Sequence, residues 1–512
     1  MSKPKSTVEF GDFQTPPSLA LAICELLLQR GVKPASIIEP NCGKGSFVLA
    51  CLETFKTVTR IVGTDINARH LACLASVLEA QSFSPDVEVF RGDFYETDWT
   101  RILKPLQQPL LVIGNPPWVT NAGLGVIGGS NLPVKSNFQR HAGLDAITGK
   151  SNFDISEWML IRELEWLNGQ TGTLAMLCKK AVARKVLMYA WKNSMQLCGA
   201  DIYAVDAKIH FNASVESCLL VCDLSPSCTS RECRVHPKLQ HTPEVGTFGL
   251  RDARLVADIC AYERWKSLAG KSKGYNWRSG IKHDCAEVME FQKEGTGYRN
   301  GLGEHTELEE NFLYPLVKSS RLANGREVKP DRWMLVTQRR IGENTDHIKQ
   351  VAPKTWKYLC DHANLLNRRA SAIYKGRPPF SIFGVGEYVF APWKVAISGF
   401  YKNLEFKIVG PMGGRPVVFD DTCYFLACGS EEEARTLTNF LNSRPAREFY
   451  SSLIFWDAKR PVTVEVLSQL KLDSAVGYPS DFGEMQSGRL PKSRSAECKK
   501  NRGCDVALPF TF

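Results

Sequence analysis

The sequence predicts an α/β protein, with a Rossmann-like domain built on a seven-stranded sheet followed by a second domain of α+β type. Short apolar runs alternate with helical patterns through the first 225 residues, which is typical of a mostly parallel sheet covered by helices. Glycine-containing or acidic segments follow three of these runs, at the strand ends where open α/β sheets bind ligands. Beyond residue 225 the regular order is lost. We therefore expect a ligand-binding first domain over residues 1–225.

The elements of the first domain follow from the apolar runs and the residues that flank them. Pro17 and Gly31 frame the first helix, because proline favours the first helical turn and glycine the position after the last. The predicted strands are Ser36–Glu39, Arg60–Asp65, Glu88–Arg91, Leu110–Gly114, Thr173–Cys178, Ile202–Asp206 and Ser217–Cys222. The predicted helices are Leu19–Arg30, Ser46–Phe55, Ala68–Glu79, Asp154–Leu167 and Val182–Leu197.

The rest of the chain predicts a linker, a second domain and a tail. Residues 226–248 are rich in Ser, Pro, Thr, His and Cys with little periodicity, which predicts an irregular linker. Residues 249–475 carry mixed helical and strand-like signals, and residues 476–512 are polar and basic, so we expect a flexible tail there. The predicted helices are Asp252–Leu268 and Glu431–Asn442, and the predicted strands are Trp333–Thr337, Trp393–Ser398, Lys407–Val409 and Tyr424–Leu426.

Composition narrows the class of protein. The 512 residues carry a formal net charge of +10, which is a weak indication of a polyanionic partner. No run approaches the roughly 18 apolar residues of a membrane span. Because the N-terminus has no export signal, we expect a cytoplasmic protein without membrane contact whose 17 cysteines are reduced. The densest cysteine group, Cys218, Cys222, Cys228 and Cys233 with His236, is irregularly spaced, so we expect no metal there, and we expect Cys218 and Cys222 to face one side of a buried strand.

Three segments at predicted strand ends form a candidate nucleotide-type site. The turn Glu39–Phe47 contains Gly43 and Gly45, which let the backbone turn sharply and a ligand approach closely. Asp65 ends the second strand, where a carboxylate suits a ribose diol, and Asp93-Phe94 after the third strand suits an adenine amino group and ring. The glycine spacing alone also fits a dinucleotide-binding fold. The order of all three segments favours one extended adenosine site.

The segment Asn115-Pro116-Pro117-Trp118, directly after a predicted buried strand, is the candidate reaction centre. Its prolines fix two φ angles and remove two backbone donors, so the carbonyls are presented rigidly. The Asn115 side-chain oxygen and the Pro116 carbonyl can both accept hydrogen bonds from one planar amino group, and Trp118 offers a stacking platform. Two acceptors stabilise the positive charge that develops as such a nitrogen attacks, so positioning and electrostatics suffice without a general base. A tight turn beside a core tryptophan is the alternative.

In order and content these motifs resemble the catalytic domain of the gamma-class adenine-N6 DNA methyltransferases of restriction–modification systems. Phe10–Pro16 resembles the family's N-terminal cofactor motif, and Gly149–Phe153 matches a motif before a helix. Trp118 stands where the family more often has tyrosine. Phe211 falls where the family places a second aromatic ring against the target base, although a lone phenylalanine is also typical of a core.

The resemblance implies an S-adenosylmethionine-dependent methyltransferase that flips an adenine out of double-stranded DNA, because its amino nitrogen cannot reach the cofactor inside the stack. Catalysis is then expected at Asn115-Pro116-Pro117-Trp118, with the base held by Asn115, Trp118 and Phe211. The cofactor-binding residues that it implies are Thr15, Glu39, Pro40, Asn41, Gly43, Gly45, Asp65, Ile66, Asp93, Phe94 and Asn115.

By the same resemblance, the second half is interpreted as a DNA target-recognition domain. Arginine and lysine are interleaved there with aromatic residues, a combination that suits phosphate contacts and groove insertion. We expect DNA contacts from Arg339, Arg368, Lys375 and Arg377. No nuclease motif is recognised, so we expect a methyltransferase without cleavage activity, with any cognate restriction endonuclease on a separate chain. We expect the enzyme to be a monomer.

Other substrates and other classes of protein are alternatives to this interpretation. The tetrapeptide chemistry also suits guanine N2 or adenine N6 in RNA, or a protein glutamine side chain; the N-terminal motif and the large second domain favour DNA. A non-catalytic DNA-binding subunit of the same fold is disfavoured by the intact Asn115, Trp118 and Asp93. A nicotinamide dehydrogenase has no use for the Asn-Pro-Pro-Trp turn.

Overall fold

The computed structural model describes residues 14–80, 85–118, 154–240, 243–324, 330 and 332–473. The chain divides into two compact units, with a boundary between Val256 and Ala257, and each unit is described by itself. Three predicted features lie outside the described residues: Phe10–Phe13 of the N-terminal motif, Gly149–Phe153, and the tail 476–512. Among the described residues, no helix is both long enough and apolar enough to cross a membrane.

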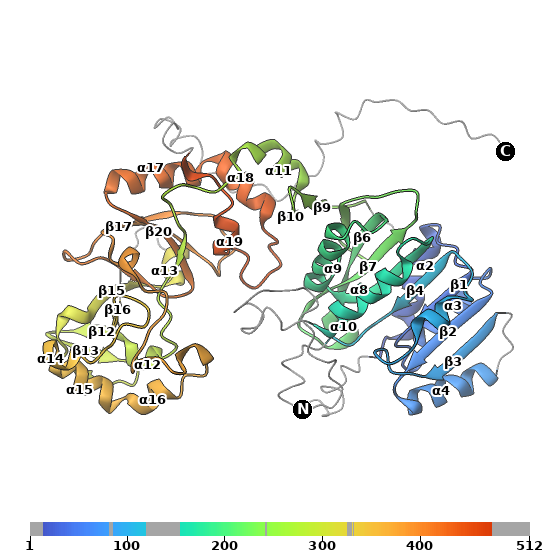
Figure 1. Ribbon diagram of the computed structural model, residues 1–512, viewed down its shortest axis with the longest axis horizontal. Coiled ribbons are helices and arrows are strands. Elements are labelled where there is room, and N and C mark those ends of the chain that lie inside the picture. Colours follow the sequence, from blue (N-terminus) through green and yellow to red (C-terminus); the bar gives the residue numbers. More distant parts are fainter. Residues whose placement is uncertain are drawn as a thin grey trace. The chain divides into compact units, whose positions relative to one another are not determined.

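The first unit is built on one large sheet (Figure 1). Among the described residues it has ten strands, in the order β10-β9-β8-β6-β7-β5-β4-β1-β2-β3. The strands are β1 (Ser36–Glu39), β2 (Arg60–Asp65), β3 (Asp86–Arg91), β4 (Leu110–Gly114), β5 (Gly172–Lys179), β6 (Leu197–Asp206), β7 (Glu216–Leu224), β8 (Glu232–His236), β9 (Gly246–Arg251) and β10 (Arg254–Val256). From β1 to β5 neighbouring strands are parallel, whereas β7 is antiparallel to β5 and β6. All seven predicted strands are present, and the predicted Rossmann-like fold is confirmed.

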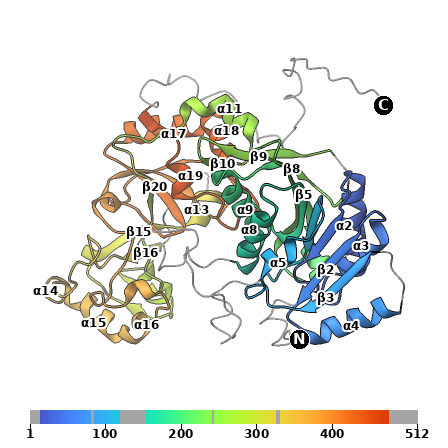
Figure 2. The ribbon, with the colours of Figure 1, turned by 45° about the vertical axis from the view of Figure 1, so that its right-hand side comes forward.

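Helices cover both faces of this sheet. They are α2 (Pro17–Gln29), α3 (Ser46–Thr54), α4 (Ala68–Glu79), α5 (Trp99–Leu103), α8 (Ile155–Leu167), α9 (Lys180–Lys192) and α10 (Ala207–Phe211). Side chains of α2, α3 and α4 share one apolar core with alternate residues of β1, β4, β5 and β7. Helices α8 and α9 pack on each other and against β5, outside that core. Figure 2 shows β3 at one edge of the sheet, with α4 beside it.

The prediction of a linker over residues 226–248 is wrong, because this segment contains β8 and the start of β9, which extend the sheet next to β6. Charge rather than apolar periodicity holds β8 in place. The buried Asp201 carboxylate of β6 lies 2.8 Å from Arg234 Nη2 and 2.8 Å from His236 Nε2, both of β8. It also lies 2.8 Å from Arg30 Nη1 at the end of α2. A pattern search based on apolar residues could not detect such a strand.

The cysteines of this unit differ in part from expectation. Cys198 and Cys228 form a disulfide, so the prediction of uniformly reduced thiols is wrong for this pair; the β6 bulge and the turn after β7 bring the two residues within 5.1 Å at their Cα atoms. Cys218, Cys222 and Cys233 are buried in β7 and β8. Among the described residues, no His, Cys, Asp and Glu cluster is arranged to hold a metal ion.

The second unit contains two sheets, with the orders β11-β20-β17-β18 and β14-β13-β12-β16-β15-β19 in the described residues. The strands are β11 (Arg278–Ser279), β12 (Glu290–Glu294), β13 (Gly297–Asn300), β14 (His305–Thr306), β15 (Leu313–Val317), β16 (Arg332–Leu335), β17 (Trp393–Ser398), β18 (Lys407–Val409), β19 (Val418–Phe419) and β20 (Cys423–Cys428). The helices are α11 (Ile259–Trp265), α12 (Ala286–Met289), α13 (Ser319–Asn324), α14 (Ile348–Val351), α15 (Pro353–Asp361), α16 (Ala363–Asn367), α17 (Glu431–Asn442), α18 (Arg444–Leu453) and α19 (Val464–Leu467), with the 3-10 turns η1 (Lys266–Leu268), η2 (Glu310–Phe312), η3 (Ala372–Tyr374) and η4 (Glu387–Phe390).

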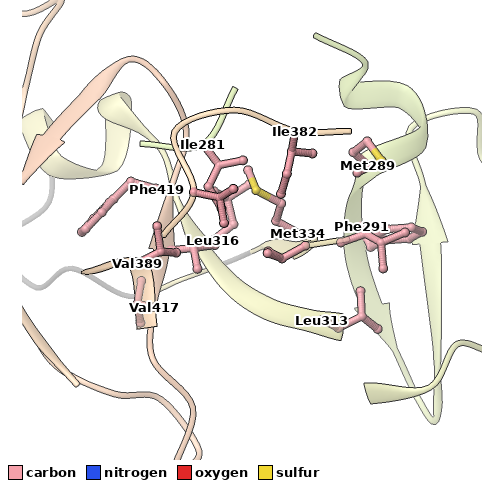
Figure 3. Close-up of a cluster of buried hydrophobic side chains, with 14 of the residues drawn as sticks. Ile281, Met289, Phe291, Leu313, Leu316, Met334, Ile382, Val389, Val417 and Phe419 are labelled. Atoms are coloured by element: carbon pink, nitrogen blue, oxygen red, sulfur yellow. The ribbon is translucent and has the colours of Figure 1, made fainter. Parts of the chain in front are cut away.

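A continuous apolar core joins the strands and loops of the second unit, as Figure 3 shows for part of it. Phe291 of β12, Leu316 of β15 and Phe419 of β19 are among its buried residues.

The helix predicted over Asp252–Leu268 is wrong at its start. Asp252 and Ala253 adopt positive φ angles of 47° and 61°, which turn β9 back into β10, and the helix begins only at Ile259.

Candidate active site

The turn that follows β1 is shaped by two left-handed glycines. Gly43 has φ 52° and Gly45 has φ 84°, a region that other residues rarely adopt. A Cβ atom on Gly45 would lie 2.3 Å from Leu74 Cδ1 of α4. Gly45 is therefore required by the turn into α3 and by close packing on α4.

Glu39 closes the same turn from inside the protein. Its side chain is only 3% exposed, and its Oε2 accepts a hydrogen bond from Val48 N of α3 at 3.0 Å. Burial raises the pKa of the Glu39 carboxyl well above its ordinary value, and the nearby Asp65 carboxylate acts in the same direction. Glu39 thus fixes the start of α3 against the end of β1.

Asp65, at the end of β2, joins the glycine turn to the next loop. Its Oδ2 accepts from Gly43 N at 2.8 Å, and its Oδ1 accepts from Asn67 N at 2.7 Å. Each carboxylate oxygen can accept a second hydrogen bond, so the carboxylate can still receive both hydroxyls of a ribose. The neighbouring Ile66 is 38% exposed and offers an apolar contact at the same strand end.

The Asp93-Phe94 segment after β3 departs from one expectation. Asp93 Oδ1 accepts from Tyr95 N at 2.8 Å, which fixes the loop. The Phe94 ring is only 6% exposed and contacts Trp99, Trp158 and Trp166, with ring centroids 5.4, 5.8 and 5.5 Å away. The predicted open stacking face on Phe94 is therefore not present in this structure. No local sequence pattern indicates this cluster, because two of its rings come from α8.

Asn115 meets Thr15 across a sequence separation of 100 residues. Its Nδ2 donates to Thr15 Oγ1 at 3.3 Å, and the Thr15 carbonyl accepts from Ser46 Oγ at 2.7 Å. Thr15 is only 7% exposed. The N-terminal segment, the glycine turn and the tetrapeptide are thus linked through one residue, which brings three separately predicted motifs together.

Trp118 and Phe211 also meet. Their ring centroids lie 5.1 Å apart with an interplanar angle of 68°, and both side chains are 7% exposed. These two aromatic residues, each predicted to lie against the target base, are therefore brought together by the fold. The two rings contact each other edge to face.

Two residues at this site were missed by sequence reasoning. Lys179, the last residue of β5, donates from Nζ to the Trp118 carbonyl oxygen at 3.1 Å. The same Nζ lies 2.5 Å from Oδ2 of Asp154, the N-cap of α8. Neither residue belongs to a motif with recognisable spacing, so only the fold could reveal the pair.

The basic residues predicted to contact DNA lie in the second unit. Arg339 is largely exposed, with its guanidinium carbon 4.3 Å from the Phe390 ring centroid. Arg377 is exposed and lies near the loop of Arg339, because its Nη1 is 3.9 Å from the point where a Cβ atom would lie if Gly342 carried a side chain. Lys375 and Arg368 are exposed as well. The neighbouring Arg369 instead donates to main-chain carbonyls and has a structural role.

The glycine turn, the acids after β2 and β3, and the Asn-Pro-Pro-Trp turn after β4 all lie at the carboxyl edge of a Rossmann-like sheet whose seventh strand is antiparallel. This fold and site define an S-adenosylmethionine-dependent methyltransferase.

Comparison with known proteins defines the family. No family model matches the chain. The chain is 46% identical over 471 residues to the Type II methyltransferase M.NspV of Nostoc sp. (strain ATCC 29411 / PCC 7524), a match that covers 92% of this chain and 97% of the relative. The chain therefore belongs to the Type II methyltransferase family, and the resemblance to restriction–modification methyltransferases is confirmed at that level.

Solved structures with a similar fold include two restriction–modification proteins. The Type IIL restriction-modification enzyme MmeI, solved in complex with DNA, matches with a TM-score of 0.49 and 12% identity, over 85% of this chain and 61% of that one. The M protein of the Type I restriction enzyme EcoKI matches with a TM-score of 0.30 and 13% identity, over 44% of this chain and 48% of that one.

Proposed function

We propose that this chain methylates the N6 amino group of an adenine in double-stranded DNA, as the modification enzyme of a restriction–modification system. The observation that carries the proposal is the attachment of Asn115, at the end of β4, to Thr15 of the N-terminal segment. It brings the predicted acceptor of the amine together with the predicted cofactor site. The family assignment supports DNA as the substrate class.

The cofactor site is suited to S-adenosylmethionine. Asp65 would hold the ribose hydroxyls and Asp93 the adenine amino group, with Ile66 against the ring and Thr15 toward the methionine end. When bound, the cofactor supplies an electrophilic methyl group on a sulfonium. The chain has only to exclude water and to fix the orientation of the acceptor amine.

Asn115 and Pro116 would hold that amine. Because Asn115 Nδ2 donates to Thr15, the amide is oriented, and its oxygen is the acceptor for the substrate. The Pro116 carbonyl, in a turn stiffened by two prolines, is the second acceptor. Together they would stabilise the positive charge that forms on the attacking nitrogen. The base itself would stack on Trp118 after leaving the duplex, with Phe211 moving to its edge.

The second unit is proposed to recognise the DNA sequence through Arg339, Arg368, Lys375 and Arg377. Arg339 and Arg377 come from neighbouring loops and expose guanidinium groups beside aromatic rings, an arrangement suited to phosphate contacts. We place the enzyme in the cytoplasm as a monomer, with any cognate endonuclease as a separate protein. Replacing Arg377 with alanine should weaken DNA binding and leave cofactor binding unchanged.

The decisive experiment uses S-adenosylmethionine tritiated in its methyl group and unmethylated plasmid DNA, followed by nucleoside analysis. N6-methyladenine should carry the label with the unmodified enzyme and be absent with Asn115→Ala. Asn364→Ala, an exposed position on α16, is the matched control and should methylate normally. Label in another nucleoside, or in RNA or protein but not in DNA, would overturn the proposal.

A further inference from the structure

Lys179 and Asp154 converge on the last residue of the tetrapeptide. Lys179 Nζ is 3.1 Å from the Trp118 carbonyl oxygen and 2.5 Å from Asp154 Oδ2. The side chains of Lys179 and Asp154 are 23% and 8% exposed, so the pair is largely removed from water. The second oxygen of Asp154 accepts from Ser156 N and Ser156 Oγ, which caps α8.

The geometry fixes the tetrapeptide at both ends. At its start, β4 pairs with β5 up to Gly114, opposite Met176. At its end, β5 holds Trp118 twice: the indole Nε1 donates to the Leu177 carbonyl at 3.3 Å, and Lys179 donates to the Trp118 carbonyl. The three residues between these anchors therefore have little freedom, because prolines already restrict two of them.

We infer that Lys179, held and neutralised by Asp154, is a positioning residue for methyl transfer, a conclusion that rests on the proposed role of the tetrapeptide. In the proposed reaction Lys179 contacts neither the attacking amine nitrogen nor the methyl group. It sets the place of the Trp118 ring and, through the rigid turn, the direction of the Pro116 carbonyl. The aspartate has a second effect, because an unpaired lysine cation next to the turn would oppose the positive charge that develops on the amine.

The test measures single-turnover transfer of label from tritiated S-adenosylmethionine to unmethylated plasmid DNA. Lys179→Met should slow transfer by about 10- to 100-fold, the order of loss expected from a displacement of roughly 1 Å, while the Kd values for cofactor and for the plasmid change less than about twofold. Lys179→Arg should restore a substantial part of the rate. Lys180→Met is the matched control, because Lys180 pairs with Glu216 instead, and it should leave the rate unchanged.

Asp154→Asn separates anchoring from general stability, since asparagine keeps the helix cap but loses the ion pair. It should slow transfer in the same direction as Lys179→Met, and the double variant should be no slower than Lys179→Met alone. Equal rates for Lys179→Met and the unmodified enzyme would overturn the inference, as would a loss that appears entirely in DNA or cofactor affinity.

A second readout does not depend on activity. Hydrogen exchange at the Asn115 and Trp118 amides should become faster in Lys179→Met and stay unchanged in Lys180→Met. Unchanged exchange would overturn the anchoring role even if the enzyme methylated a base other than adenine. Total label is counted without regard to the base, so failure of the adenine assignment and failure of this inference are distinguishable.

Discussion

Glu163 provides a sharp test of how burial governs stability in the first unit. This glutamate lies in α8 with 0% exposure, and within the described residues neither carboxyl oxygen has a hydrogen-bond partner. Burial raises its pKa from 4.5 to about 8. Between those two pH values the folded protein binds one more proton at this site than the unfolded chain does, so stability falls as pH rises.

The magnitude follows directly from these two pKa values. At pH 7 the folded side chain keeps its proton, whereas the unfolded side chain ionises above pH 4.5. At roughly 1.4 kcal/mol for each pH unit, the folded state is destabilised by about 3 kcal/mol relative to a residue that does not titrate. Glu163→Met has a similar volume and no charge. Its stabilising effect should therefore be small at pH 5 and grow to about 3 kcal/mol at pH 7.

The assay is urea unfolding at pH values from 5 to 8.5, followed by pulse proteolysis with detection of peptides from α8 and β5. Glu157→Met on the same helix is the contrasting control. Glu157 is also fully buried but pairs with Lys185 at 2.7 Å, so its replacement should destabilise the unit by about 1–3 kcal/mol. A Glu163→Met effect that does not change with pH would refute the reasoning, because it would mean that Glu163 is ionised in the folded state.

Three further predictions concern other buried groups and the glycine turn. Asp201→Asn should cost about 3–5 kcal/mol in urea unfolding, because it breaks the pairs that the buried Asp201 carboxylate makes with Arg30 and with the half-exposed Arg234. Burial alone would raise the pKa of Asp201, but these partners lower it, so the stability they give should be lost as pH falls below 3.8. Lys394→Met in β17 should stabilise the second unit by about 4 kcal/mol at pH 7 and about 2 kcal/mol at pH 9. The reason is that burial lowers the pKa of Lys394 from 10.5 to about 7, whereas the same lysine stays protonated in the unfolded chain. A gain in stability that does not depend on pH would contradict this prediction. Gly45→Ala should lower the melting temperature and cofactor affinity together, because its Cβ meets Leu74 and its φ is 84°; normal binding with Gly45→Ala would show that the turn tolerates a side chain.

Whether a strand could be predicted from the sequence depended on which interactions hold it in the sheet. The bounds of β1, β2 and β4 agree with prediction, because each contains a short apolar run and is followed by a turn or loop. β8 escaped prediction because it has little apolar character: its buried His236 and its half-exposed Arg234 both pair with a buried aspartate. A rule that takes apolar residues as inward cannot find a strand whose buried partners are charged.

The same division applies to the candidate site. Gly43, Asp65 and Asn115 could be proposed from the sequence because each lies at or just after the end of a different strand. The ends of the parallel strands of one sheet meet at the same edge. The side chains that orient these residues could not be proposed in the same way. Thr15 reaches Asn115 over 100 residues, and no local pattern marks that contact.

This difference bears on how such a turn works. In the proposed mechanism the acceptors of the amine would be main-chain and amide oxygens, whose chemistry any Asn-Pro-Pro sequence would supply. We propose that a functional site adds the direction of these oxygens, which in this chain would be set by the sheet on one side and by Thr15 and Lys179 on the other. An intact tetrapeptide without its anchors should therefore bind cofactor and DNA normally and still transfer methyl groups slowly. That outcome would show that the rate of methyl transfer depends on how the acceptor oxygens are oriented and not only on which residues supply them.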